Sequence, residues 1–168
     1  GIDTINDEFK LINSIYDYLK SCLGQQIITL TASKFGADKF RFEKAVYRLS
    51  QMGIVSDWVV EDFFRGTLQL EFQCIDEDQL TKNIEHTVRK YEPNFEINDV
   101  FSNDSEHYKF ICERLEKRKI DKTQFAFLVL LFWSYDHFAY NRRQSLKTVY
   151  EQCGDLASGR IDEKQFKD

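Results

Sequence analysis

The chain has 168 residues, of which 42% are hydrophobic and 15% aromatic, so it has enough apolar material for a packed core and is not a disordered segment. Its formal net charge of -5 argues against a surface that is basic throughout, so any contact with nucleic acid requires a local concentration of positive charge. The longest apolar run, Phe125 to Trp133, is much shorter than the roughly twenty residues of a membrane span, and it predicts a buried helix.

The first quarter of the chain predicts a helix, a strand and a short helix. Apolar residues recur at helical spacing over residues 5–23, with Thr4 and Asp7 as an expected capping box and Gly24 as the expected stop. The β-branched segment from Gln25 to Leu30 predicts a strand. The segment "TASKFGAD" that follows predicts a brief helix that ends at Gly36.

A longer helix and a hairpin follow. Asp38 is the expected N-cap of a helix whose apolar face is formed by Phe42, Ala45, Val46 and Leu49, and Gly53 is expected to end it. The runs "IVSDWVV" and "TLQLEFQ" are rich in strand-forming residues and are joined by "EDFFRG", which predicts a β-hairpin.

This order of elements is that of a winged helix-turn-helix. Such a module places its third helix in the major groove when it binds DNA, and its hairpin is the wing. We therefore predict a mainly α-helical fold with a small β-hairpin wing, in which residues 1–75 form a winged-helix domain.

The second half, residues 76–168, predicts a helical domain or extension. The segments 76–91, 105–119 and 122–152 have helical patterns, and a loop is expected from Pro93 to Asp104. We expect the chain to be a fragment of a longer protein, because Gly1 resembles a cloning remnant and the last residues begin a helix without ending it.

The outward face of the predicted third helix is basic and aromatic. The stretch from Lys34 to Gly53 has five positive and two negative residues, a local charge of +3 in a chain of -5. Lysine and arginine can hold phosphates, and Arg48 or Gln51 can reach base edges. A solvated helix face without a ligand is the alternative. The predicted nucleic-acid contacts on this segment are Lys34, Lys39, Arg41, Lys44, Tyr47, Arg48 and Gln51, with Phe40 on the same face.

The tip of the predicted wing adds Phe63, Phe64 and Arg65 to the predicted contacts. Adjacent aromatic side chains at a hairpin tip can stack on an unpaired base or form a wedge at a duplex end. The alternative is that at least one phenylalanine folds back onto the helical second half. Two acidic neighbours, Glu61 and Asp62, disfavour close approach of phosphate at that point.

Two further basic groups lie downstream. One is the run from Arg114 to Lys119, and the other consists of Arg142, Arg143 and Lys147. They can extend a track of phosphate contacts, although solvent-facing helix surface is the more common role of such runs.

No catalytic, cofactor or metal site is predicted in this chain. Every histidine follows an acidic residue, as in Glu85-His86, but neighbours on a helix point in different directions and do not form a dyad. Phosphate-binding glycine loops and the common hydrolase motifs are missing from the sequence. The cysteines, Cys22, Cys74, Cys112 and Cys153, are far apart and predict reduced, intracellular thiols rather than a zinc ribbon or a disulfide framework.

The segments "FEKAVYRLSQMGIVSDWVV", "GTLQLEF" and "YNRRQSLKTVYEQC" resemble the region that follows the motor domains in bacterial RecQ-family ATP-dependent DNA helicases. The resemblance implies a winged helix that grips duplex DNA beside a fork, and a hairpin that helps to part the strands. It also implies ATP and Mg²⁺ chemistry on a motor outside this chain, a cytoplasmic, nucleoid-associated location, and intramolecular contact with the upstream helicase domains. The chain departs from the family pattern, because the four-cysteine zinc module that precedes the winged helix is missing.

Three functions remain open from the sequence. The first is a DNA-binding accessory region of a helicase. The second is a protein-interaction module that uses the acidic surface and the phenylalanine tip, since winged helices also serve that purpose. The third, a free-standing transcription regulator, requires a dimer.

Overall fold

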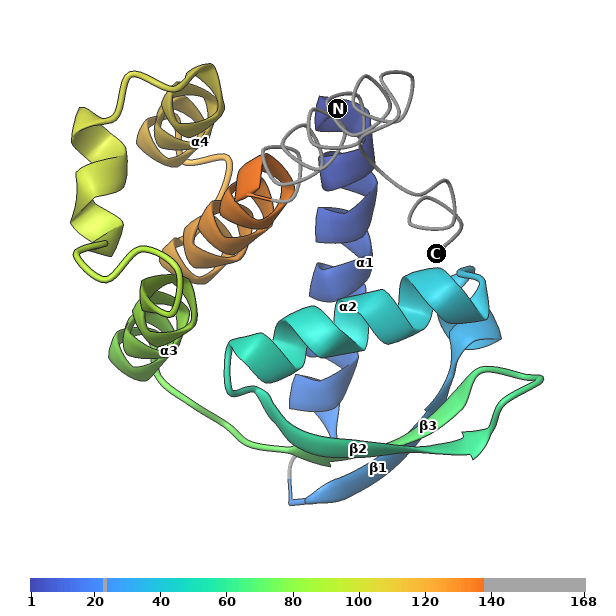
Figure 1. Ribbon diagram of the computed structural model, residues 1–168. Coiled ribbons are helices and arrows are strands. Elements are labelled where there is room, and N and C mark those ends of the chain that lie inside the picture. Colours follow the sequence, from blue (N-terminus) through green and yellow to red (C-terminus); the bar gives the residue numbers. More distant parts are fainter. Residues whose placement is uncertain (23, 138–168) are drawn as a thin grey trace, which may run out of the picture. The chain divides into compact units, whose positions relative to one another are not determined.

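The computed structural model describes residues 1–22 and 24–137 (Figure 1). In chain order the elements are α1 (Ile2–Ser21), β1 (Ile27–Thr31), the 3₁₀ helix η1 (Ala32–Phe35), α2 (Lys39–Gln51), β2 (Val55–Asp62), β3 (Thr67–Phe72), α3 (Glu77–Arg89), the 3₁₀ helix η2 (Ile97–Ser102) and α4 (Glu106–Glu116). Residues 122–137 are also helical. The prediction of a helix-rich fold with a small β element is confirmed: the sheet is a three-stranded antiparallel one.

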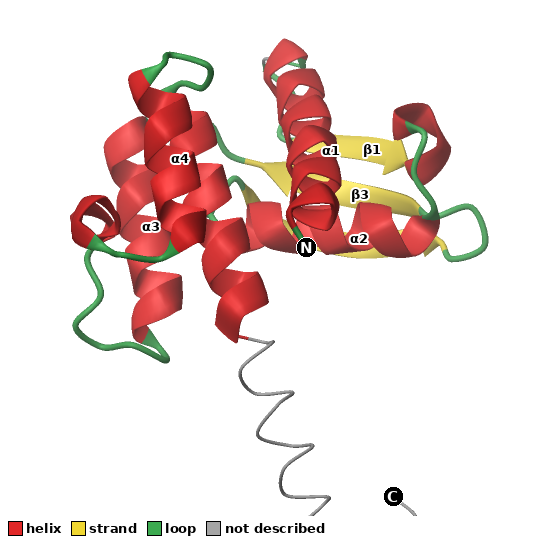
Figure 2. Cartoon of the chain, turned by 90° about the horizontal axis from the view of Figure 1, so that it is seen from above, coloured by secondary structure: helices red, strands yellow, loops and turns green. Residues whose placement is uncertain are grey.

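The sheet has the strand order β1-β3-β2, so the predicted hairpin is joined by the strand that precedes it in the chain. Residues on β1 and β3 alternate between buried and exposed, as expected for strands with one covered face. Helices α1 and α2 cover the same face of the sheet (Figure 2). The side chains of Ile28, Leu30, Leu68 and Leu70 are buried, and with the apolar faces of α1 and α2 they form the core of this half.

The ends of α2 follow the sequence prediction. The Asp38 side chain accepts a hydrogen bond from the backbone N–H of Arg41 at 2.9 Å and caps the N-terminus. Gly36 ends η1 in the left-handed conformation with φ of 65°. Gly53, with φ of 76°, follows Met52, the C-cap residue of α2, and turns the chain into β2.

The predicted start of the first helix is wrong. Helix α1 begins at Ile2 after Gly1, and no side chain caps it. Thr4 and Asp7 lie inside the helix and do not form the expected capping box, because Gly1 is the N-cap residue.

The second half is attached to the first through α2 and α3. The Thr87 hydroxyl donates to the Gln51 carbonyl oxygen at 3.0 Å, and the Asn83 side-chain amide donates to the Met52 carbonyl oxygen at the same distance. Both acceptors lie at the C-terminal end of α2, where carbonyl groups have no partner within the helix. These bonds fix α3 against the end of α2.

The expected loop from Pro93 to Asp104 contains η2. The Glu85 carboxylate on α3 accepts a hydrogen bond from the backbone N–H of Ile97 at 3.1 Å, and Ile97 and Val100 are buried. This tertiary anchor orders a segment whose sequence has no strong helical pattern.

The chain divides into a compact unit of Gly1–Phe132 and a second unit of Trp133–Asp168. The predicted boundary between residues 75 and 76 lies inside the first unit. Of the second unit the structure describes residues 133–137, which are helical. The residues from Phe125 to Trp133 are all buried, as predicted, and in the part that the structure describes no helix has the length and apolarity to span a bilayer.

Candidate nucleic-acid interface

The outward face of α2 is aromatic and basic. Phe40 is 69% exposed and Tyr47 is 47% exposed, while the opposite face is fully buried at Phe42 and Val46. The side chain of Lys44 is about half exposed, and its Nζ lies 3.8 Å from a carboxylate oxygen of Glu8 on α1. Arg41 is also exposed. The predicted contact face therefore exists at Phe40, Arg41, Lys44 and Tyr47.

The placement of Arg48 on this face is wrong. Arg48 is 3% exposed, and its Nε donates to Oε1 of Glu8 at 3.0 Å. Glu8 is itself 8% exposed and belongs to α1, forty positions earlier in the chain. The flank of α2 that carries Arg48 packs against α1, so the guanidinium neutralises a buried carboxylate and is not available to DNA.

The wing tip is exposed. Phe64 is 90% exposed and Phe63 is 58% exposed, so neither side chain is buried against the helical second half. The two rings meet edge to face with centroids 5.9 Å apart. Lys39, at the start of α2, places its Nζ 3.8 Å from the Phe63 ring centroid and 5.2 Å from that of Phe40.

The close approach of the hairpin turn to α2 explains this cluster. A Cβ on Gly66, in the turn, would lie 2.7 Å from the Cβ of Lys39. The structure thus joins the N-terminus of α2 and the wing tip into one surface.

Two other predicted contacts have local partners. Arg65 lies near Asp62, which accepts from its backbone N–H at 3.1 Å and has a carboxylate oxygen 3.8 Å from its Nε. Lys34 on η1 places its Nζ 3.7 Å from the ring centroid of Tyr18 on α1. Lys34 is therefore directed toward α1 and not along the outward face of α2.

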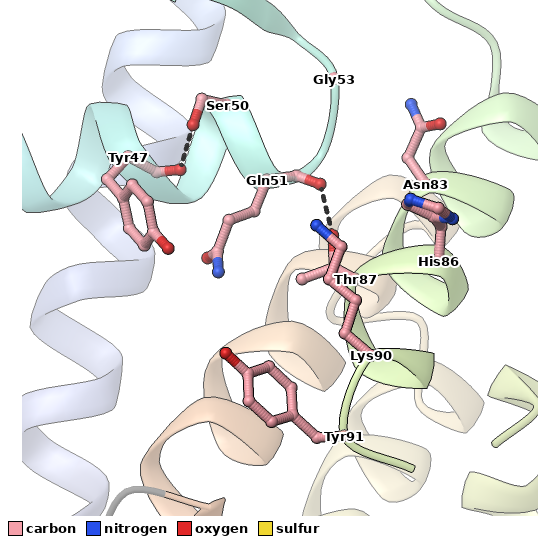
Figure 3. A pocket seen from close by; sticks show the side chains of 9 residues that line it. All are labelled: Tyr47, Ser50, Gln51, Gly53, Asn83, His86, Thr87, Lys90 and Tyr91. Atoms are coloured by element: carbon pink, nitrogen blue, oxygen red, sulfur yellow. Dashed lines mark hydrogen bonds between the residues drawn. The ribbon is translucent and has the colours of Figure 1, made fainter. Parts of the chain in front are cut away.

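A pocket of about 420 Å³ lies beside Tyr47, between the end of α2 and α3 (Figure 3). Its lining residues are Tyr47, Ser50, Gln51, Gly53, Asn83, His86, Thr87, Lys90 and Tyr91. Two of the predicted contacts, Tyr47 and Gln51, thus belong both to the outer surface of α2 and to this pocket.

Sequence reasoning missed the α3 side of the pocket. Asn83, His86, Thr87 and Lys90 recur at spacings of three and four, which place them on one face of a helix. That polar stripe was the available signal. It could not identify a pocket, because the facing wall comes from a helix more than thirty residues away.

In the downstream basic run, Arg114 packs against α1, while Lys117, Arg118 and Lys119 are exposed. The guanidinium of Arg114 lies 5.7 Å from the Phe9 ring centroid and donates to the side-chain oxygen of Asn6 at 3.4 Å. Lys117 pairs with Glu113 on the same helix. Arg142, Arg143 and Lys147 lie outside the described residues.

Within residues 1–22 and 24–137, no group of three or more histidine, cysteine, aspartate and glutamate side chains is arranged to hold a metal. His107 stacks on Phe132, with ring centroids 4.8 Å apart, and His86 lines the pocket. Cys22, Cys74 and Cys112 are free thiols, and Cys153 is outside the described residues.

Comparison with known proteins identifies no relative: no protein-family model, curated protein or solved structure matches the chain.

Proposed function

We propose that the chain binds DNA as a winged helix-turn-helix, with the outward face of α2 as the recognition surface and the hairpin β2–β3 as the wing. The order α1, β1, η1, α2, β2, β3 supports this proposal, as does the pairing of β1 with the hairpin. In this reading η1 takes the place of the second helix of the motif, reduced to a single 3₁₀ turn.

The observation that carries the proposal is the exposure of Phe40, Lys44 and Tyr47, with Arg41 also exposed, on the outward face of α2. Exposed cations can neutralise phosphates, and exposed aromatic rings offer contact with sugars and bases. Arg48 has no part in the proposed contact, since its guanidinium is buried and paired with the Glu8 carboxylate.

We further propose that the chain is an accessory region of a RecQ-like ATP-dependent DNA helicase. This step is supported by the sequence resemblance described above. ATP hydrolysis would then belong to motor domains outside this chain, and a fork would be the natural DNA substrate.

The test is a titration of a labelled forked duplex by fluorescence anisotropy, at salt concentrations between about 50 mM and about 200 mM. Binding through phosphates predicts that affinity falls steeply as salt rises. The double variant Arg41→Gln/Lys44→Gln should reduce the slope of the log–log plot by about two, one for each lost phosphate contact.

The matched control is Lys109→Gln on α4, which removes an exposed lysine paired only loosely, at 3.9 Å, with Asp104. Its binding should equal that of the unmodified chain. Failure of the unmodified chain to bind the fork at low salt would overturn the proposal.

A second candidate is a protein-interaction module, and the exposure of Phe64 favours it. A phenylalanine that is 90% exposed at a hairpin tip is a common anchor for a partner chain. The affinity of the Phe64→Ala variant for the fork, compared with that of the unmodified chain, separates the two candidate functions. A loss of about tenfold indicates stacking on DNA, and an unchanged affinity favours a protein partner for the tip.

A further inference from the structure

The pocket between α2 and α3 combines aromatic rings with hydrogen-bond donors. Tyr47 and Gln51 enter it from α2, and Lys90 and Tyr91 enter it from the end of α3, with their side chains directed toward a common space (Figure 3). His86 also lines the pocket. None of the nine lining residues is acidic, although acidic residues outnumber basic ones in the chain by five.

Several polar groups of the lining already have hydrogen-bond partners within the chain. The Thr87 hydroxyl donates to the Gln51 carbonyl oxygen, and the Asn83 side-chain amide donates to the Met52 carbonyl oxygen. These two backbone carbonyl groups at the end of α2 therefore have hydrogen-bond partners on α3. The side-chain oxygen of Gln51 accepts from Arg48 at 3.4 Å, which directs the amide nitrogen of Gln51 away from Arg48. In Figure 3 this nitrogen points into the space between the two tyrosines.

The size and chemistry of the pocket select its ligand. A volume of about 420 Å³ lies in the range of small-molecule sites. Aromatic faces bind any nucleobase by stacking, and lysine attracts the attached phosphate. The side-chain amide of Gln51 can pair with a base edge. A negatively charged ligand can enter, because the lining carries no carboxylate that would repel it.

From this arrangement we infer that the pocket takes one unpaired nucleotide, held by stacking on Tyr47 and Tyr91 and by a phosphate contact with Lys90. The inference rests on the proposed function, since the pocket adjoins the proposed DNA-binding face through Tyr47 and Gln51. The pocket extends that face: α2 holds the duplex, and the first nucleotide beyond the duplex end enters the space between α2 and α3.

The experiment compares three probes on the full chain: a blunt duplex, the same duplex with a short single-stranded overhang, and the same overhang with abasic sites. Both overhang polarities are tested. We expect the normal overhang to bind about tenfold more tightly than the blunt duplex. The abasic overhang has the same phosphates, so it should bind less tightly than the normal one.

Variants at the far wall then test the assignment. For both Tyr91→Ala and Lys90→Gln, the ratio of overhang affinity to blunt affinity should fall from about ten toward one. Tyr91→Phe retains the ring and should keep the ratio. Lys109→Gln, which removes a comparable exposed lysine from α4, should also keep it.

A spectroscopic readout reports stacking directly. With 2-aminopurine as the first unpaired base, fluorescence should fall on binding to the unmodified chain and to Tyr91→Phe, and should fall less with Tyr91→Ala. Equal affinity for abasic and normal overhangs, or the same quenching with Tyr91→Ala, would overturn the nucleotide assignment.

The two proposals fail in different ways. A chain that binds blunt and overhang probes equally retains DNA binding but has no nucleotide pocket. A chain that binds none of the probes at low salt lacks the proposed function itself.

Discussion

Replacing Arg48 by methionine should destabilise the fold and should not remove a DNA contact. The side chains of Arg48 and Glu8 are only 4% and 8% exposed, and their charged atoms are 3.0 Å apart. Removing one member of a buried pair leaves the other charge without its partner, which typically costs about 3–5 kcal/mol. Lys44, at 3.8 Å from the other oxygen of Glu8, offsets part of that charge. We therefore expect the lower end, about 3 kcal/mol.

The measurement is thermal unfolding followed by circular dichroism. For a chain of this length, about 3 kcal/mol corresponds to a fall in Tm of about 6–12 °C. The control Lys44→Met removes the half-exposed partner of the same carboxylate and should cost less than about 1 kcal/mol.

A double variant tests the cause. Glu8→Leu with Arg48→Met replaces the pair by apolar side chains of similar size, and such replacements are often neutral or stabilising. We expect its Tm to return to within about 3 °C of the unmodified chain. If Arg48→Met left Tm unchanged but lowered affinity for the fork tenfold, the buried role of Arg48 would be refuted.

Three further predictions concern the backbone and the thiols. Gly53→Ala should lower the free energy of unfolding by more than about 2 kcal/mol, because φ is positive and the new Cβ would lie 2.2 Å from Nδ2 of Asn83. Gly24→Ala, where φ is also positive but the space is open, should cost about 1 kcal/mol. Both values are measured by urea denaturation. Asp38→Ala should cost about 1 kcal/mol in the same assay, through loss of the cap on α2. Burial raises the pKa of the Cys112 thiol, so at pH 8 iodoacetamide should alkylate the exposed Cys74 before Cys112, as followed by peptide mass spectrometry.

Local signals in the sequence were sufficient for the ends of α2 and for the hairpin. Three features illustrate this: the cap at Asp38, the left-handed Gly36 and the turn at Gly53. Each of them depends on residues only a few positions apart in the sequence. The same is true of the turn between β2 and β3, where a few residues connect strands that pair directly. Such features are determined by short segments of sequence, so they can be predicted without knowledge of the tertiary structure.

The failures share a different cause. Helical projection gives the angle of Arg48 relative to Phe42 and so predicts an outward position, but that angle does not say where α1 crosses α2. The burial of Arg48 depends on Glu8, forty positions away. The anchoring of η2 by Glu85 and the pocket wall from α3 are likewise tertiary contacts without a local pattern.

Arg48 and Lys44 contact the same carboxylate and have different roles on α2. A carboxylate at the position of Glu8 would repel phosphate if it were exposed beside Lys44, but its charge is buried and paired with Arg48. Lys44, on the next turn of α2 toward the N-terminus, stays half exposed and shares the same carboxylate at longer distance. The buried pair thus fixes the crossing of α1 and α2, and with it the direction in which Lys44 and Tyr47 face. Under the proposed function, Arg48 acts on DNA binding only through this geometry, so its substitution should alter affinity only as far as it alters folding.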